Sequence, residues 1–185
     1  MTGANQAVSE ITAQGRAVNF LYPSVRTVID IGAQFSRIFR VEANGTVSNF
    51  VISEKCAAGS GRLLQVIARV LQIDVKDMGK LSLNSTQRVD FTTNCAVFIE
   101  SEVISRIAEG YTREDIAAGV QRSLAAKVQV LVERVGMVPD FALVGGTANN
   151  RGLVKSIEEG LKTELVIPEQ PQIMAALGAA LMAVK

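Results

Sequence analysis

The two cysteines, Cys56 and Cys95, are the side chains of this chain best suited to metal chemistry. They stand 39 positions apart, and each opens a stretch that we expect to be helical, CAAGSGRLLQVIARVL and CAVFIESEVISRIAEG. A helix N-terminus carries about half a positive charge, which lowers a thiol's pKa and favours the metal-binding thiolate. Because two thiolates cannot close a four-ligand site, a metal cluster held here would need two ligands from a second chain.

A structural role is the alternative for both cysteines. Free cysteine is among the most buried residue types and often only fills space in a core. Small residues follow Cys56 as far as Gly61, however, and leave backbone amides free to approach whatever the sulfur holds. This setting, repeated at a second expected helix start, favours the metal-binding interpretation.

Two expected strand ends carry residues suited to phosphate chemistry. Asp30 and Gly32 end the apolar run RTVIDIG, where an aspartate can hold Mg²⁺ or orient a water while the turn amides face an anion. Gly145, Gly146 and Thr147 follow FALV, where paired glycines let the backbone approach a ligand closely. A plain turn and a tight strand–helix connection are the respective alternatives.

Composition excludes several classes of function. The sequence has no histidine, which excludes Ser-His-Asp and Cys-His catalysis and histidine-bearing zinc sites. A net charge of +1, 5% aromatic residues and no tryptophan give no reason to expect nucleic acid or an anionic membrane as a partner. No apolar run reaches the ~18 residues of a spanning helix, and the N-terminus has no signal core. We therefore expect a cytoplasmic protein without a structural disulfide.

The periodicity of the rest predicts a layered α/β domain. Strands are expected at 26–32, 36–42, 46–53, 141–146 and 165–167, with Asn44-Gly45 closing a hairpin between the second and third. Helices are expected after each cysteine, at 74–81, from the capping box Thr112–Asp115 to Gly136, at 150–161 and at 172–184.

Other stretches give weaker or more specific expectations. Residues 5–20 read as a poorly defined helix or loop, and residues 82–92 as a loop or short strand. In the second cysteine helix the apolar spacing places Val97, Val103, Ile104 and Ile107 inward. The final helix, rich in alanine and glycine, is expected to lie close against a sheet. The charged residues at 74–80 read as a solvated face, and the acids at 100 and 102 as favouring their helix dipole.

These motifs resemble those of the activator ATPases of 2-hydroxyacyl-CoA dehydratases and the related ATPase subunits of benzoyl-CoA reductases. The resemblance covers nearly the whole chain, and its most specific parts are the stretches from Glu54 to Arg62 and from Cys95 to Ser105. It implies the actin-like ATPase (ribonuclease H-like) α/β fold of the acetate kinase, sugar kinase and actin superfamily. It divides the chain into residues 1–53, the remainder of a first subdomain, and 54–185, a second subdomain.

The resemblance also implies cofactors and sites. One [4Fe-4S] cluster would be shared by two subunits, with Cys56 and Cys95 as the ligands from this chain. ATP or ADP with Mg²⁺ would bind in a cleft, with Asp30 as the catalytic carboxylate and Gly32 at the phosphates. Gly145, Gly146 and Thr147 would complete the nucleotide site.

The implied activity is ATP-linked transfer of one low-potential electron. The implied acceptor is an iron–sulfur dehydratase or reductase. The implied donor is a ferredoxin or flavodoxin, and the other subunit is a second copy or a paralogue.

The sequence departs from the family pattern in several places. The family opens with a strand and a Gly-x-Asp-x-Gly-Ser phosphate loop that this chain lacks, so we expect part of the first subdomain to be missing from it. The family's Asp-Ile-Gly-Gly-Gln-Asp reads with Ala33 and Phe35 here, and its Cys-His pair is Ala13-Gln14. These changes favour a second interpretation, a cluster-binding structural subunit beside a competent ATPase paralogue. A sugar- or acyl-kinase relative without metal is the third.

Overall fold

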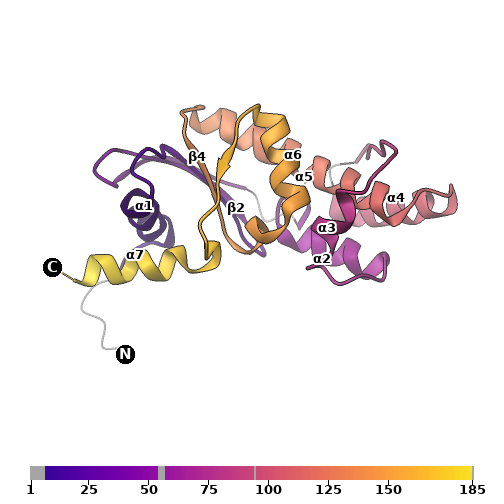
Figure 1. Ribbon diagram of the computed structural model, residues 1–185, viewed down its shortest axis with the longest axis horizontal. Helices are drawn as coiled ribbons and strands as arrows, with labels where there is room; N and C mark the ends of the chain where they lie inside the picture. The colour runs from indigo at the N-terminus through magenta and orange to yellow at the C-terminus, as the bar shows by residue number, and fades with distance from the viewer. Residues whose placement is uncertain (1–6, 54–56, 94, 185) are drawn as a thin grey trace.

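The computed structural model describes residues 7–53, 57–93 and 95–184. Its centre is one five-stranded mixed sheet in the order β3-β2-β1-β4-β5 (Figure 1). The strands are β1 (Thr27–Ile31), β2 (Ser36–Val41), β3 (Val47–Ile52), β4 (Phe141–Val144) and β5 (Leu165–Val166). The first three pair antiparallel, whereas β1–β4 and β4–β5 pair parallel. Strands on both sides of residue 54 therefore belong to the same sheet.

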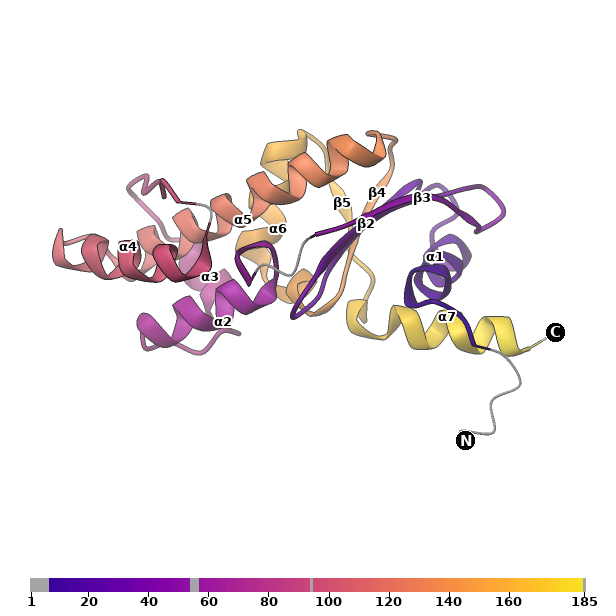
Figure 2. The ribbon, with the colours of Figure 1, turned by 180° about the vertical axis from the view of Figure 1, so that it is seen from behind.

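Helices cover both faces of this sheet and extend well beyond it (Figures 1 and 2). They are α1 (Glu10–Leu21), α2 (Gly61–Val70), α3 (Met78–Ser82), α4 (Ala96–Ala108), α5 (Arg113–Val135), α6 (Arg151–Leu161) and α7 (Met174–Ala183). Alternation along β1 sends Val28 to the core beneath α1 and α7, and Ile29 and Ile31 to the larger core beneath α5 and α6. The elements α2, α3 and α4 form an arm beyond the sheet (Figure 2).

The predicted hairpin is confirmed. Strands β2 and β3 pair antiparallel with Phe39 opposite Phe50. In the turn, Gly45 has a φ of 82°, and the Asn44 side-chain oxygen accepts a 3.0 Å hydrogen bond from the Thr46 amide. The hairpin could be predicted from the sequence because Asn44 and Gly45 alone determine the geometry of the turn.

The long helix α5 is also confirmed, with its cap. The Thr112 hydroxyl accepts a hydrogen bond from the Asp115 amide at 3.2 Å, and Gly136 ends the helix with a φ of 96°. The helix predicted at 150–161 is present as α6. The predicted strands are present at 27–31, 141–144 and 165–166. Of the stretch 74–81, only its second half is helical, and 83–92 contains no strand.

Helix α1 is better defined than the sequence indicated. Ser9 caps it by accepting a 3.1 Å hydrogen bond from the Thr12 amide. Its buried face consists of small residues and one amide, including Ala13, Gln14 and Ala17. Because these residues form only a weak apolar stripe, the hydrophobic periodicity did not predict a well-defined helix here.

The closest neighbour of α7 is α1, rather than the sheet that the sequence analysis expected. The two helices run side by side (Figures 1 and 2), and a Cβ at Gly178 would collide with the Ala13 carbonyl. Met174 and Leu177 still reach the core beneath the sheet. The alanines and Gly178 therefore let two helix backbones approach each other.

The predicted inward face of α4 is wrong for three of its four residues. Val97, Ile104 and Ile107 are exposed at 67%, 57% and 43%, and only Val103 is buried. The buried side of α4 consists of Ala96, Ile99 and Val103, which face α2 and α5. Helix α4 is apolar on two faces, so its sequence could not indicate which one packs.

No helix in the described part of the chain is long and apolar enough to cross a membrane.

The α1–α7 crossing predicts opposite outcomes for two glycine-to-alanine changes. Gly178→Ala should lower the free energy of unfolding by about 2–3 kcal/mol, because the new methyl group must force the two backbones apart. Gly160→Ala, at an exposed position of α6 beside the flexible Gln129 side chain, should raise it by up to about 1 kcal/mol. Urea denaturation of both variants measures the difference, and equal effects would contradict the close packing of α1 on α7.

Candidate functional site

A cleft of about 520 Å³ opens at the carboxyl ends of β1 and β4. The parallel strands end at the same edge of the sheet, where open α/β sheets bind their ligands. Gly32 and Ala33 line the cleft from the turn after β1, and Gly146 and Thr147 from the turn after β4. The first turns of α2 and the Lys76 side chain line it from the helical arm.

The turn after β1 is tied to the start of α2. The Gly61 amide donates to the Gly32 carbonyl at 2.9 Å, and the Arg62 amide to the Ala33 carbonyl at 3.1 Å. The Ser60 hydroxyl also donates to the Ala33 carbonyl, at 3.1 Å. The amides of Ala33 and Gln34 have no hydrogen-bond partner among the described residues. The turn thus offers donors to a ligand while its carbonyls hold the helix.

The turn after β4 requires glycine at position 145. Gly145 has a φ of 88°, and a Cβ there would lie 2.7 Å from Asp30 Oδ1 and 2.8 Å from the Ile31 carbonyl oxygen. The Thr147 hydroxyl donates to the same carbonyl at 2.9 Å. The two turns are therefore in direct contact.

The Asp30 carboxylate lies behind the cleft rather than in its lining. Asp30 is 2% exposed and accepts hydrogen bonds from Gln14 Nε2 at 3.1 Å and from an Arg37 guanidinium nitrogen at 2.9 Å. Arg37 also contacts Glu10 at 2.8 Å. Burial raises the pKa of Asp30 above its ordinary value, although the Gln14 hydrogen bond and the Arg37 charge lower it in part.

The structure therefore gathers five of the predicted site residues at one place. Gly32, Gly146 and Thr147 line the cleft, and Asp30 and Gly145 lie directly behind it. Gln65 and Gln172 also line the cleft, which no sequence pattern predicted, and so does Lys76, which was predicted to lie on a solvated face. Backbone amides beside a lysine can bind an anion such as a phosphate.

Cys95 is not among the residues that line this cleft. Cys95 is the exposed N-cap residue of α4, as predicted. Cys56 lies outside the described residues, but α2 begins at Gly61, five residues later, after a 3₁₀ turn at Ala57–Gly59. The α-helix expected after Cys56 therefore starts only at Gly61, with Ser60 at its N-cap.

The described residues contain no group of three or more histidine, cysteine, aspartate and glutamate side chains that could hold a metal ion. Cys95, however, fits the role of one ligand in a shared set. Its thiol is exposed at the N-terminus of a 13-residue helix, where a shared cluster could reach it.

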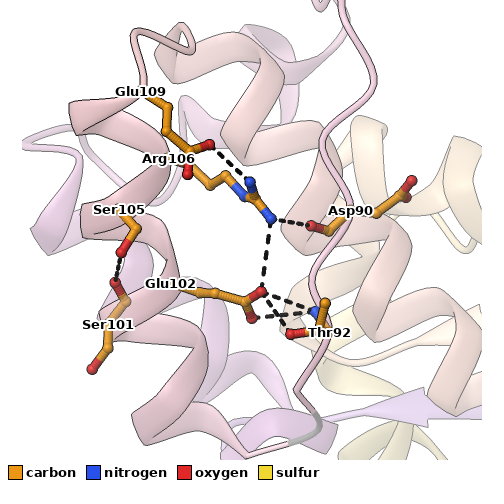
Figure 3. A network of polar contacts seen from close by, with 7 residues as sticks. All are labelled: Asp90, Thr92, Ser101, Glu102, Ser105, Arg106 and Glu109. Atoms are coloured by element: carbon orange, nitrogen blue, oxygen red, sulfur yellow. Dashed lines mark hydrogen bonds and ion pairs between the residues drawn. The ribbon is translucent and has the colours of Figure 1, made fainter.

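A polar network fixes the segment that leads to Cys95 (Figure 3). The Glu102 carboxylate accepts hydrogen bonds from the Thr92 amide at 3.1 Å and from the Thr92 hydroxyl at 2.9 Å. Arg106 lies 3.9 Å from Glu102, pairs with Glu109 at 2.8 Å and donates to the Asp90 carbonyl. Helix α4 thus holds the backbone of residues 90–92 through its side chains.

The pKa of Glu102 agrees with its role in holding the segment before Cys95. Burial alone would raise the pKa of Glu102, but hydrogen bonds from Thr92 and Thr93 and the charge of Arg106 outweigh it and lower the pKa. Glu102 is therefore more than an acid that favours its helix dipole. No sequence pattern indicated this contact, because Thr92 precedes the helix by several residues.

The family comparison covers nearly the whole chain. Residues 2–183 match the model of the BadF/BadG/BcrA/BcrD ATPase family. The 2-hydroxyisocaproyl-CoA dehydratase activator of Clostridioides difficile is 43% identical over 180 residues, which are 97% of this chain and 68% of that protein. The (R)-2-hydroxyglutaryl-CoA dehydratase activating ATPase of Acidaminococcus fermentans is 44% identical over 98% of this chain and 70% of its own length.

Solved structures agree with these sequence relatives. The activator of the 2-hydroxyisocaproyl-CoA dehydratase from Clostridium difficile with bound ADPNP superposes with a TM-score of 0.95 at 42% identity, over 99% of this chain and 68% of that one. The ethanolamine utilization protein EutJ from Carboxydothermus hydrogenoformans, at 22% identity and a TM-score of 0.58, shares the fold alone. The fold is that of the actin-like ATPases, as predicted.

The Glu102 network predicts a local effect that depends on pH. Glu102→Gln should lower the hydrogen-exchange protection of the Thr92 amide about tenfold, since it removes a charge-assisted bond. Because the folded-state pKa is lowered, the contact is intact above the ordinary value of 4.5 and is lost as pH falls through the folded pKa. The protection of the Thr92 amide in the wild type should therefore decrease as the pH falls through the folded-state pKa of Glu102. The variant should show no such decrease.

Glu100→Gln is the matched control, since Glu100 makes no hydrogen bond or ion pair with any described residue. It should leave Thr92 protection unchanged. Equal protection in wild type and Glu102→Gln would show that the network does not hold the segment.

Proposed function

The chain belongs to the BadF/BadG/BcrA/BcrD ATPase family, and we propose that it is an ATP-linked iron–sulfur component that passes a low-potential electron to a partner enzyme. The partner is a 2-hydroxyacyl-CoA dehydratase or an aryl-CoA reductase, and the setting is the cytoplasm. The observation that carries the proposal is the contact between the two glycine turns, which forms a nucleotide-sized cleft beside the segment after Cys56.

The nucleotide site rests on this cleft and on the relatives. A solved relative at 42% identity contains ADPNP. In this chain the free amides of Ala33 and Gln34 and the Lys76 side chain suit phosphates. We place the phosphates of ATP at Gly32 and the adenosine at Gly145, Gly146 and Thr147, with Asp30 orienting water or Mg²⁺.

The hydrogen bonds between the two segments suggest how nucleotide and cysteine communicate. A ligand that moves the Gly32–Ala33 turn must also move Ser60, Gly61 and Arg62, because the turn's carbonyls hold them. These residues follow Cys56 by four to six positions. ATP can shift the cysteine segment only as far as it binds one arrangement better than the other.

The cysteines are the proposed cluster ligands. Cys56 and Cys95 would supply two thiolates, and a second copy or a paralogue would supply the other two. When bound, a [4Fe-4S] cluster supplies a one-electron carrier, for which a ferredoxin or flavodoxin is the proposed donor. The exposed apolar residues Val97 and Phe98 beside Cys95 suit a subunit contact.

The second candidate is a cluster-binding structural subunit that does not turn over ATP. The observation that favours it is the Asp30–Arg37 ion pair, which occupies the candidate catalytic carboxylate. Ala33 and Phe35 in the phosphate turn point the same way. ATP hydrolysis by the anaerobic protein distinguishes the two, since this candidate predicts no rate above that of buffer.

Anaerobic purification tests the cluster proposal directly. The wild-type protein should be brown and contain four irons per two chains, whereas Cys95→Ser should lose most of its iron, because one ligand of each chain is removed. Ser105→Ala, an exposed change on the same helix, should keep the iron. Iron analysis and absorption spectra measure this. A colourless wild-type protein, or equal iron in Cys95→Ser, would contradict the proposal.

A further inference from the structure

A second groove, of about 810 Å³, runs along one face of α5 and shares no lining residue with the nucleotide cleft. From Gly119 to Arg134, residues of α5 recur along it every three or four positions. Fifteen residues of helix span about 22 Å. The opposite wall consists of the loop from Arg88 to Phe91, the end of β3 at Ile52, and the next residue, Ser53.

The groove is strongly cationic. Its described lining residues include four cations, Arg88, Arg122, Lys127 and Arg134, and one carboxylate, Asp90. That carboxylate is already paired with Arg88 at 2.9 Å. Arg134 is exposed and forms no hydrogen bond or ion pair with any described residue. Arg122 and Arg134 therefore carry positive charge that the one acid of the described lining does not balance.

Arg122 is the most informative of these cations. Its side chain is partly buried and donates to the Val89 carbonyl at 2.9 Å, while its Nε atom is buried without a partner. No carboxylate of the described residues lies within ion-pair distance of it. Burial and then the charge of Arg88 lower the pKa of Arg122. A partly buried guanidinium without a carboxylate is unfavourable, and an anion from another molecule would relieve this.

The shape of the groove suits an extended peptide. Ser123 and Ala126 give it a small-residue floor, and at the Gly119 end the Val89 carbonyl packs directly on α5. Ile52 and Val130, exposed at 44% and 48%, add apolar contact area. A length of about 22 Å matches an extended segment of about six or seven residues.

We infer that this groove docks an acidic, extended segment of the iron–sulfur partner enzyme. The inference rests on the proposed function. Ser53 and Gly59 flank the Cys56 segment in the sequence, and Phe91 lies four residues before Cys95, so a docked segment would contact residues that are close in sequence to the proposed cluster ligands. A second copy fits less well, because in a twofold contact centred on this groove the cations of one copy would face those of the other. Nucleic acid fits less well too, since Phe91 is the single aromatic among the described lining residues.

Fluorescence anisotropy with fluorescein-labelled hexaglutamate tests the inference. The wild-type chain should bind this peptide, ignore labelled hexalysine, and bind more weakly as salt rises from 0.01 to 0.15 M, where the screening length falls from about 30 to about 8 Å. Arg122→Gln with Arg134→Gln should weaken binding about tenfold. Arg134→Gln alone should weaken it severalfold, and it removes no contact that the fold uses.

Arg69→Gln with Lys155→Gln is the matched control, because it removes the same charge from exposed positions on α2 and α6. It should leave the affinity within about twofold of wild type. No binding by wild type, or equal weakening in both double variants, overturns the inference. Tighter binding of a labelled thymidine hexanucleotide through the same arginines overturns it in favour of nucleic acid.

This titration needs neither iron nor ATP. It therefore separates the groove from the proposed function. If the protein is brown but does not bind hexaglutamate, only the docking surface is rejected. If the protein is colourless but binds hexaglutamate through Arg122 and Arg134, only the electron-transfer proposal is rejected.

Discussion

The parallel pairing of β1 with β4 is the contact on which the site depends. It brings two glycine turns to the same edge of the sheet, and it forces Gly145 against the Ile31 carbonyl and the Asp30 carboxylate, where no side chain fits. Thr147 then closes the contact with a hydrogen bond to Ile31. Helix α2 takes its place from the same turn, since its first amides donate to Gly32 and Ala33. One strand pair thus positions the cleft, the arm and the segment after Cys56.

Hydrogen bonds with charged side chains position the loop that precedes Cys95, just as strand pairing positions the cleft. Residues 83–93 contain no helix or strand, yet three groups hold them. The Asp115 carboxylate accepts hydrogen bonds from the amides of Thr86 and Gln87. Its hydrogen bonds, of which the one from Thr112 has the largest effect, keep the pKa of Asp115 far below the ordinary value. Arg122 donates to Val89, and Glu102 accepts from Thr92. The loop therefore has a defined path, and that path forms one wall of the cationic groove.

Local rules predicted the elements well and the partners of side chains poorly. Asn44-Gly45 and the Thr112 cap each decide their structure within four residues, so the hairpin and α5 could be predicted. Helix α1 was underrated because its buried face is small residues packed on α7, which lies more than 150 positions away. The inward face of α4 was predicted wrongly for three of four residues because the helix is apolar on two faces. The Arg37 and Gln14 partners of Asp30 come from other elements, and no local pattern indicates such contacts.

The central claim is that the edge formed by β1 and β4 binds a nucleotide, and calorimetric titration of the whole chain with ADPNP tests it most directly. Wild type should bind one equivalent per chain. Gly146→Val should bind at least about tenfold more weakly, because its side chain enters the cleft beside Gln172. Gly160→Val, the same change at an exposed glycine of α6, should bind as wild type does. Equal affinity in wild type and Gly146→Val would place the nucleotide elsewhere and contradict the account.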